Sequence, residues 1–239
     1  MATDQAIKLA VLVDADNAQA SVITEILGEV ARYGSATVRR AYGDWTTPNL
    51  STWKNVLHVH AVQPIQQFGY TKGKNATDSA LIIDAMDLLH SGNVDGFCLV
   101  SSDSDFTRLA TRIREAGLVV YGFGEKKTPQ PFVAACDKFV FTEILREPAA
   151  KSKPRKASDA GLRELLVSTI SSIVQEDGWA PLSVVGSLIN KSDPSFDARN
   201  FGYKKLGDLV KDQSYLDVQD RPGGGGSSVV HLFVRVKEA

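Results

Sequence analysis

The first 146 residues alternate between continuous apolar runs and segments in which apolar residues recur with helical spacing. Continuous apolar runs are typical of parallel strands that are covered on both faces. We expect such strands at residues 7–13, 37–42, 58–62, 97–100, 118–123 and 138–141. We expect helices at residues 21–33, 50–57, 77–90, 106–116 and 131–136. This alternation predicts an α/β domain in which a parallel sheet lies between two layers of helices.

The pattern changes after residue 146. Residues 147–158 are rich in Pro, Ala, Lys and Arg without an apolar period, which predicts an exposed basic linker. In residues 159–239, the spacing predicts helices at 162–174, 182–189 and 203–210, then strands at 215–218 and 229–236 around the loop 221–228. Three helices followed by a hairpin indicate a small winged-helix domain of the α+β type. The expected division is therefore 1–146, 147–158 and 159–239.

The composition is that of an ordinary globular protein. The 239 residues are 43% hydrophobic and 23% charged, with a formal net charge of −1. Such a balance gives no overall nucleic-acid signal, so any binding of this kind must come from local patches. Cys98 and Cys136 lack metal-ligand spacing and are expected to be buried thiols. With no signal-peptide pattern and no long apolar run, a cytoplasmic protein without membrane contact is the default expectation.

Pairs of aspartates follow two of the predicted strands. Asp14 and Asp16 come after residues 7–13, and Asp103 and Asp105 come after residues 97–100. In an open α/β sheet, ligands bind outside the carboxyl ends of the strands, so these side chains are expected to form one acidic pocket. Crowded carboxylates raise one another's pKa unless a cation neutralises them. Oxygen ligands of this kind favour Mg²⁺ or Mn²⁺.

A further aspartate, Asp78, begins the predicted helix at residues 77–90, and helix starts in such folds lie at the same edge of the sheet. Asp84 and Asp87 lie about 120° and 180° further round the helix, so they are expected in solvent. Capping is the alternative explanation. Asp14 or Asn17 could cap the first helix, Asn75 with Asp78 could form a capping box, and one of Asp103 and Asp105 could cap the next helix. Capping accounts for one acid of the last pair, not both.

Basic residues near this acidic edge would hold a polyanionic substrate. Lys72 and Lys74 precede the Asp78 helix, and Arg39 lies on the second predicted strand. Arg40, Tyr42 and Trp45 could add stacking and phosphate contacts, although Tyr42 and Trp45 are equally compatible with packing. No Ser-His or Cys-His constellation and no phosphate-binding glycine loop is evident.

The strings VLVDADNAQ, AYGDW, KGKNATDSALIIDAM and LVSSDSDFTRLATRIREAGLVVYGFG together resemble the NYN domain family of PIN-like nucleases, in particular its LabA-like branch. The resemblance covers about residues 7–143. It implies a ribonuclease site dependent on Mg²⁺ or Mn²⁺. Matched by motif, the metal-binding acids would be Asp14, Asp78, Asp103 and Asp105, with Asn17 as a polar companion that positions the scissile phosphate.

The second region resembles the LOTUS domain, also called OST-HTH, over about residues 160–237. The matching strings are LRELLVSTISSIVQEDGWAPLSVVGSLI, DPSFDARNFGYKKLGDLV and VVHLFV. This resemblance implies an RNA-binding module, with G-rich RNA among the ligands of the family and DEAD-box helicases among the partners of some members. Lys204 and Lys205, at the expected start of the third helix, are the predicted phosphate contacts, with Arg199 and Arg221 as weaker candidates.

The leading hypothesis is a metal-dependent endonuclease acting on single-stranded RNA, with a tethered RNA-binding module that raises the local substrate concentration. One alternative is a regulatory RNA-binding protein without turnover. A second is a phosphatase of the haloacid-dehalogenase type, which the strand followed by Asp14 and Asp16 fits superficially. Association into a homo-oligomer is left open by the sequence.

Overall fold

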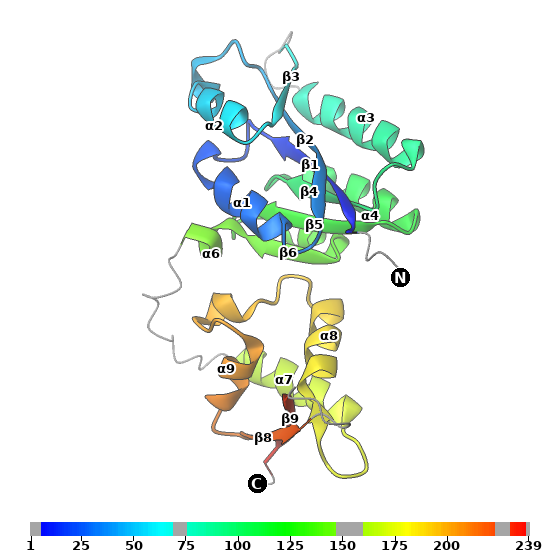
Figure 1. Ribbon diagram of the computed structural model, residues 1–239, viewed down its shortest axis with the longest axis vertical. Helices are drawn as coiled ribbons and strands as arrows, with labels where there is room; N and C mark the ends of the chain where they lie inside the picture. Colours follow the sequence, from blue (N-terminus) through cyan, green and yellow to red (C-terminus); the bar gives the residue numbers. More distant parts are fainter. Residues whose placement is uncertain (1–5, 69–75, 147–159, 223–229, 238–239) are drawn as a thin grey trace. The chain divides into compact units, whose positions relative to one another are not determined.

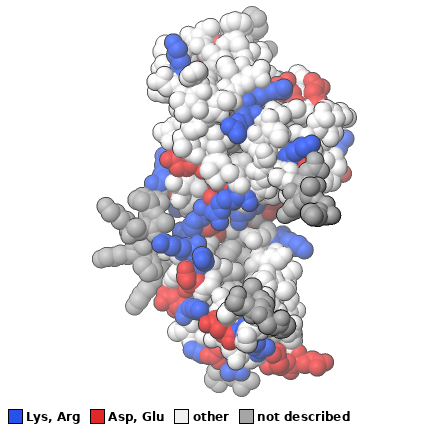
Figure 2. All heavy atoms as spheres, viewed as in Figure 1, with Lys and Arg blue, Asp and Glu red and all other residues white. Residues whose placement is uncertain are grey.

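The computed structural model describes residues 6–68, 76–146, 160–222 and 230–237. The chain divides into two compact units, residues 1–146 and residues 147–239 (Figure 1). Among the described residues, no helix is both long and apolar enough to cross a membrane. On the face shown in Figure 2, basic and acidic side chains are interspersed in each unit.

A parallel sheet forms the centre of the first unit. Its strands are β1 (Lys8–Asp14), β2 (Ser35–Gly43), β3 (Gln63–Gln66), β4 (Gly96–Val100), β5 (Val119–Gly124) and β6 (Lys138–Phe141). They lie in the order β3-β2-β1-β4-β5-β6, and every neighbouring pair is parallel. Along the chain, β2 and β3 are added on one side of β1, and β4, β5 and β6 are then added on the other side. The boundary between β1 and β4 is therefore the topological switch point, where α/β sheets bind ligands.

Helices cover both faces of this sheet, as the alternating sequence pattern predicted (Figure 1). The described helices of the unit are α1 (Ile23–Val30), α2 (Trp53–Val59), α3 (Ala76–Ser91), α4 (Thr107–Glu115), α5 (Gln130–Ala135) and α6 (Thr142–Arg146). Short 3₁₀ turns η1 (Ala20–Val22), η2 (Pro48–Leu50) and η3 (Ser104–Phe106) precede α1, α2 and α4. One buried cluster joins α3, α4 and α5 to the sheet, and another joins α1 and α2, with α6 packed against it. The α/β fold class is confirmed.

One predicted strand of this unit was wrong. The alternation at residues 58–62 indicated a strand, but α2 continues to Val59 and the strand is β3. The helix prevails because Trp53 and Leu57, one turn apart, bury their side chains in the core. β3 lies at the edge of the sheet, where Pro64 removes only one donor from the ladder.

The second unit combines helices with a small antiparallel sheet. Its elements are α7 (Ala160–Ile173), β7 (Ala180–Pro181), α8 (Leu182–Ser192), the 3₁₀ turn η4 (Ala198–Phe201), α9 (Leu206–Lys211), β8 (Leu216–Pro222) and β9 (Val230–Val236). The strand order is β7-β9-β8. Leu166, Ile170 and Val185 are fully buried at its centre, together with Leu209 and Val234. This small α+β arrangement was predicted, except for β7.

The third helix of this unit was predicted at residues 203–210 but begins at Leu206. The preceding η4 is capped by Asp197, whose carboxylate accepts a hydrogen bond from the Arg199 amide. Gly202 then adopts φ 85°, a left-handed conformation that ends the turn. Arg221 and Pro222, expected in the loop 221–228, belong to β8, and residues 223–228 lie outside the described residues.

Candidate functional site

The carboxyl ends of β1 and β4 place two polar side chains opposite each other at the switch point. Val13 pairs with Val100 in the parallel register, so Asp14 and Ser101 are the next residues on the two strands. The Ser101 hydroxyl donates a 2.8 Å hydrogen bond to Asp14 Oδ2. Ser101 is a site residue that the sequence reasoning missed. Its position directly after an apolar strand, like that of Asp14, was the signal available.

Three carboxylates come together beside this pair. Asp78, from the first turn of α3, lies with Asp103 and Asp105, which flank the start of η3. One carboxylate oxygen from each of the three lies within 4.8 Å of those of the other two. We call Asp78, Asp103 and Asp105 the acidic cluster. Asp78 is buried, Asp103 is half-buried and Asp105 is exposed, so the cluster opens to solvent on one side.

Asp14 is fully buried next to the acidic cluster but lies outside this group of three. Its Oδ2 accepts a 2.8 Å hydrogen bond from Asn17 Nδ2 as well as the one from Ser101. Its Oδ1 accepts a longer bond, 3.3 Å, from the Asn17 amide. Burial raises the pKa of Asp14 above its ordinary value, and these hydrogen bonds oppose the rise. The predicted companion Asn17 is thus held by Asp14 itself.

The electrostatics of Asp78 show that the other three acids act on it. Burial, followed by the charges of Asp14, Asp103 and Asp105, raises the pKa of Asp78 to about 6. Asp103 also fulfils the capping alternative, because its Oδ1 accepts a 2.9 Å hydrogen bond from the Asp105 amide. This cap uses one oxygen of Asp103 and does not account for Asp105. The capping box expected between Asn75 and Asp78 is not tested, because Asn75 lies outside the described residues. The cluster is therefore an unfavourable concentration of negative charge for which helix capping gives only a partial structural reason.

This arrangement fits a divalent cation. Carboxylate oxygens are the ligands that Mg²⁺ and Mn²⁺ prefer, and several carboxylates can share one ion. Asp78, Asp103 and Asp105 could hold the cation on the side that opens to solvent. The buried carboxylate of Asp14 would add negative charge on the protein side of the cation. Neutralisation by the ion would remove the charge repulsion that adds to burial in raising the pKa of Asp78.

The basic residues predicted near the acids are placed differently. Lys72 and Lys74 lie outside the described residues. Arg39 does not point to the acidic cluster; its guanidinium donates hydrogen bonds to the carbonyls of Ala36 and His60. Trp45 packs edge-on against Trp53 and donates its indole N–H to the Ile65 carbonyl. Trp45 therefore has a packing role and is not free to stack on a substrate.

Asp84 was expected in solvent, and this was wrong. Its Oδ2 accepts hydrogen bonds from Arg40 Nη1, at 3.0 Å, and from the Tyr42 hydroxyl, at 2.9 Å. Tyr42 is fully buried, so the packing alternative holds for it too. The contacts connect α3 to β2 and so fix the helix that carries Asp78. Asp87 is exposed, as expected.

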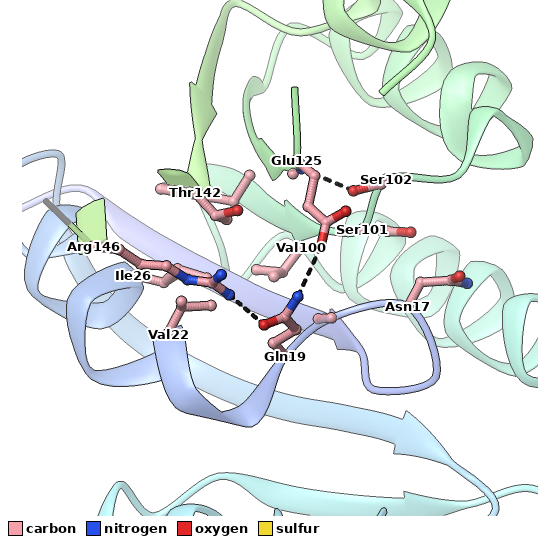
Figure 3. Close-up of a pocket in the computed structure, with 13 residues that line it drawn as sticks. Asn17, Gln19, Val22, Ile26, Val100, Ser101, Ser102, Glu125, Thr142 and Arg146 are labelled. Atoms are coloured by element: carbon pink, nitrogen blue, oxygen red, sulfur yellow. Dashed lines mark hydrogen bonds between the residues drawn. The ribbon is translucent and has the colours of Figure 1, made fainter. Parts of the chain in front are cut away.

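A small pocket lies next to the acids on the α1 side of the sheet (Figure 3). Asn17 and Ser101 line it, and Gln19 closes it by hydrogen bonding to both Glu125 and Arg146. Its volume of about 10 Å³ is the space of roughly one water molecule. The pocket is too small for a nucleotide, so the open acidic edge is the better candidate for substrate binding.

In the second unit, the two predicted phosphate contacts are accessible. Lys204 and Lys205 are exposed, and Lys205 occupies the N-cap position of α9. The weaker candidates are engaged with acids: Arg199 pairs with Asp197 at 2.7 Å. Arg221 pairs with Asp177 at 2.6 Å and lies over the rings of Trp179 and Phe233.

Comparison with known families identifies both units. A family model described as the NYN domain matches residues 8–145. The chain belongs to the NYN domain family. A second model, described as the OST-HTH/LOTUS domain, matches residues 154–228. The chain thus joins a nuclease-like NYN domain to a LOTUS domain, a type of RNA-binding module, as the two resemblances in the sequence predicted.

Three solved structures are similar to parts of the chain. A protein of unknown function from Vibrio parahaemolyticus is 21% identical, with 58% of this chain and 94% of that chain covered and a TM-score of 0.49. An uncharacterized protein from Nitrosomonas europaea is 32% identical over 39% of this chain and 88% of its own, with a TM-score of 0.32. A protein from Chromobacterium violaceum is 37% identical, with 36% and 90% covered and a TM-score of 0.29. No curated protein matches the chain.

Proposed function

We propose that the NYN domain is a divalent-metal-dependent ribonuclease that cleaves single-stranded RNA internally, and that the LOTUS domain holds the RNA for it. One observation carries this proposal: three carboxylates from α3 and η3 converge within 4.8 Å beside the buried Asp14, at the switch point of an NYN sheet. Such a concentration of charge destabilises the domain unless a cation occupies it. Mg²⁺ or Mn²⁺ is the cation that suits the ligands.

The residues divide the work of the reaction. Asp78, Asp103 and Asp105 would hold the cation, which when bound would supply an activated water and stabilise the charge that develops on the phosphate. Asp14 orients Asn17 through two hydrogen bonds, and Asn17 positions the scissile phosphate. Asp14 also adds to the negative field that attracts the cation. The exposure of Asp105 leaves one side of the site open to a strand of RNA.

Single-stranded RNA is the substrate that suits this open edge, because an unpaired strand can bend its backbone into the site and leaves its bases unstacked and accessible. The LOTUS domain would bind the same molecule through Lys204 and Lys205. Tethering of the two domains raises the effective concentration of RNA at the acidic cluster.

The test is cleavage of a labelled single-stranded RNA by purified protein with Mn²⁺, with Mg²⁺ and with EDTA. Wild type is compared with Asp14→Asn, Asp103→Asn and a matched control, Asp87→Asn, which removes an exposed charge from α3. We expect metal-dependent cleavage by wild type and the control, and a loss of 100-fold or more in the two site variants. A circular RNA, which has no ends, should be linearised if cleavage is internal.

Equal cleavage by all variants would identify a contaminant and refute the assignment. Binding of RNA without cleavage in any metal would instead favour the regulatory RNA-binding function. That alternative rests on the LOTUS domain alone and would leave the crowding of the four acids without a function.

A further inference from the structure

The helix that follows the acidic cluster carries a line of charged residues away from it. Asp105, Arg108 and Arg112 have the spacing i, i+3 and i+7 through η3 and α4, which run directly into each other. Residues at this spacing lie on one face of a helix. All three are exposed, whereas Leu109 and Ile113, which directly follow the two arginines, are buried. The first member of the line belongs to the acidic cluster, and the next two are arginines.

Arg108 and Arg112 have no hydrogen bond, ion pair or ring contact with any residue in the described part of the chain. A third arginine of α4 shows the contrast, because Arg114 forms an ion pair with Asp137 at 3.1 Å and also donates to the Ala135 carbonyl. Arg114 thus has a structural role, whereas Arg108 and Arg112 are not held by any side chain or carbonyl among the described residues. Arg108 and Arg112 therefore present two exposed positive charges close in sequence to the acidic cluster.

We propose that Arg108 and Arg112 bind successive phosphates of the RNA strand on one side of the scissile bond. The inference deepens the proposed function, since it assigns the path along which the substrate leaves the acidic cluster. The four acids repel the RNA backbone, and nearby guanidinium groups offset that repulsion. One helical turn separates the two arginines by about 6 Å along the axis, a distance comparable to the spacing of phosphates in an extended strand. Each guanidinium can contact phosphate oxygens with two N–H groups.

The salt dependence of RNA binding tests this path without requiring catalysis. Binding of a fluorescent single-stranded RNA to the full chain is measured in EDTA over a range of salt concentrations. The double variant Arg108→Gln/Arg112→Gln is compared with wild type. The control Lys8→Gln removes an exposed charge at the amino end of β1, about 20 Å along the strand from Asp14. The LOTUS domain is the same in all three proteins, so its contribution to the slope cancels.

We expect the slope of log K against log salt to decrease in magnitude by about 1.4 in the double variant, about 0.7 for each lost phosphate contact with a single strand. The control should keep the wild-type slope, and Arg108→Lys/Arg112→Lys should keep most of it because the charge remains. In cleavage assays, the Gln variant should raise KM severalfold with kcat little changed.

A slope in the double variant equal to that of wild type would overturn the proposal, provided that circular dichroism shows an intact fold. Glutamine and arginine have similar helix propensities, so α4 is expected to remain folded. The two proposals can fail separately. A protein that never cleaves RNA but loses slope in the Gln variant would retain this RNA path and refute the nuclease.

Discussion

Replacing Asp78 by Asn should stabilise the metal-free protein at neutral and alkaline pH, although the change removes a proposed metal ligand. Asp78 is buried beside three other carboxylates, and its pKa is raised to about 6. In the unfolded chain, the carboxyl group returns to an ordinary pKa of 3.8. The folded protein therefore holds a proton on Asp78 in a range of pH where the unfolded chain has released it.

The sign and size follow from proton linkage. Between pH 3.8 and about 6 the folded state binds more protons at Asp78 than the unfolded state does, so this group lowers the free energy of unfolding as the pH rises. Above about pH 7 the loss is complete. The difference between the two pKa values corresponds to about 3 kcal/mol. This is an upper bound, because water and side-chain relaxation in a site open on one side screen part of the repulsion.

Urea unfolding followed by tryptophan fluorescence measures the effect. The chain has three tryptophans. Trp45 and Trp53 belong to the first unit, so a Trp179→Phe background restricts the signal to that unit. In EDTA at pH 8, Asp78→Asn should be more stable than its parent by about 1–3 kcal/mol. Below pH 4 the two should converge. Asp87→Asn, an exposed change on the same helix, should show no such pH-dependent difference.

Mn²⁺ should reverse the order of stability. A cation bound only by the folded state adds about 2.7 kcal/mol at a concentration 100 times its dissociation constant. The parent should gain this stabilisation at pH 8, and Asp78→Asn should gain much less. If Asp78→Asn were less stable than its parent in EDTA at both pH values, the carboxylates would not repel one another as inferred. If Mn²⁺ stabilised both proteins equally, Asp78 would not be a ligand.

Three further changes test other parts of the structure. Ser101→Ala removes the hydrogen bond to Asp14, so the pKa of Asp14 should rise further and the acid limb of the cleavage–pH profile should move to higher pH. Gly122 lies in β5, and Gly122→Ala would place a Cβ 2.3 Å from the ring of Phe139 in the neighbouring strand β6. This overpacking should lower the stability of the first unit by about 1–3 kcal/mol in urea unfolding. Leu166→Ala leaves a cavity in the LOTUS core and should cost about 2–5 kcal/mol. Calorimetry should show that only the second unit is affected, because the cores share no residue.

The sequence was sufficient to predict the layered α/β fold and the meeting of the acids. Parallel strands joined by helices place all their carboxyl ends at one edge, so Asp14 and the pair Asp103 and Asp105 had to share that edge. Helix starts follow the same rule, which brought in Asp78. These predictions needed only the direction of each element. They did not need the strand order, and β1 and β4 proved to be neighbours.

The failures concern features that depend on packing or on local capping. Residues 58–62 alternate like a strand, but the burial of Trp53 and Leu57 extends α2 to Val59. The start of the third LOTUS helix depends on the cap at Asp197 and the left-handed Gly202. Arg39 was expected beside the acids, yet backbone carbonyls hold its side chain elsewhere. The contact of Arg39 with the His60 carbonyl is distant in the sequence, whereas the start of α9 is set by a local cap and a left-handed glycine.

The three aspartates of α3 illustrate how packing assigns function to chemically identical residues. Asp78 lies in the first turn, where the helix meets the edge of the sheet, and joins the acidic cluster. Asp84 lies further along and is held by Arg40 and Tyr42 of β2. Asp87 faces solvent. Helical spacing separates the three directions, but it is Arg40 and Tyr42 on β2 that give Asp84 its partners. That ion pair also anchors α3, so the orientation of Asp78 depends on an acid that touches neither cation nor RNA. Asp84→Asn should therefore weaken Mn²⁺-dependent cleavage less than Asp78→Asn, and should lower the stability of the first unit where Asp78→Asn raises it.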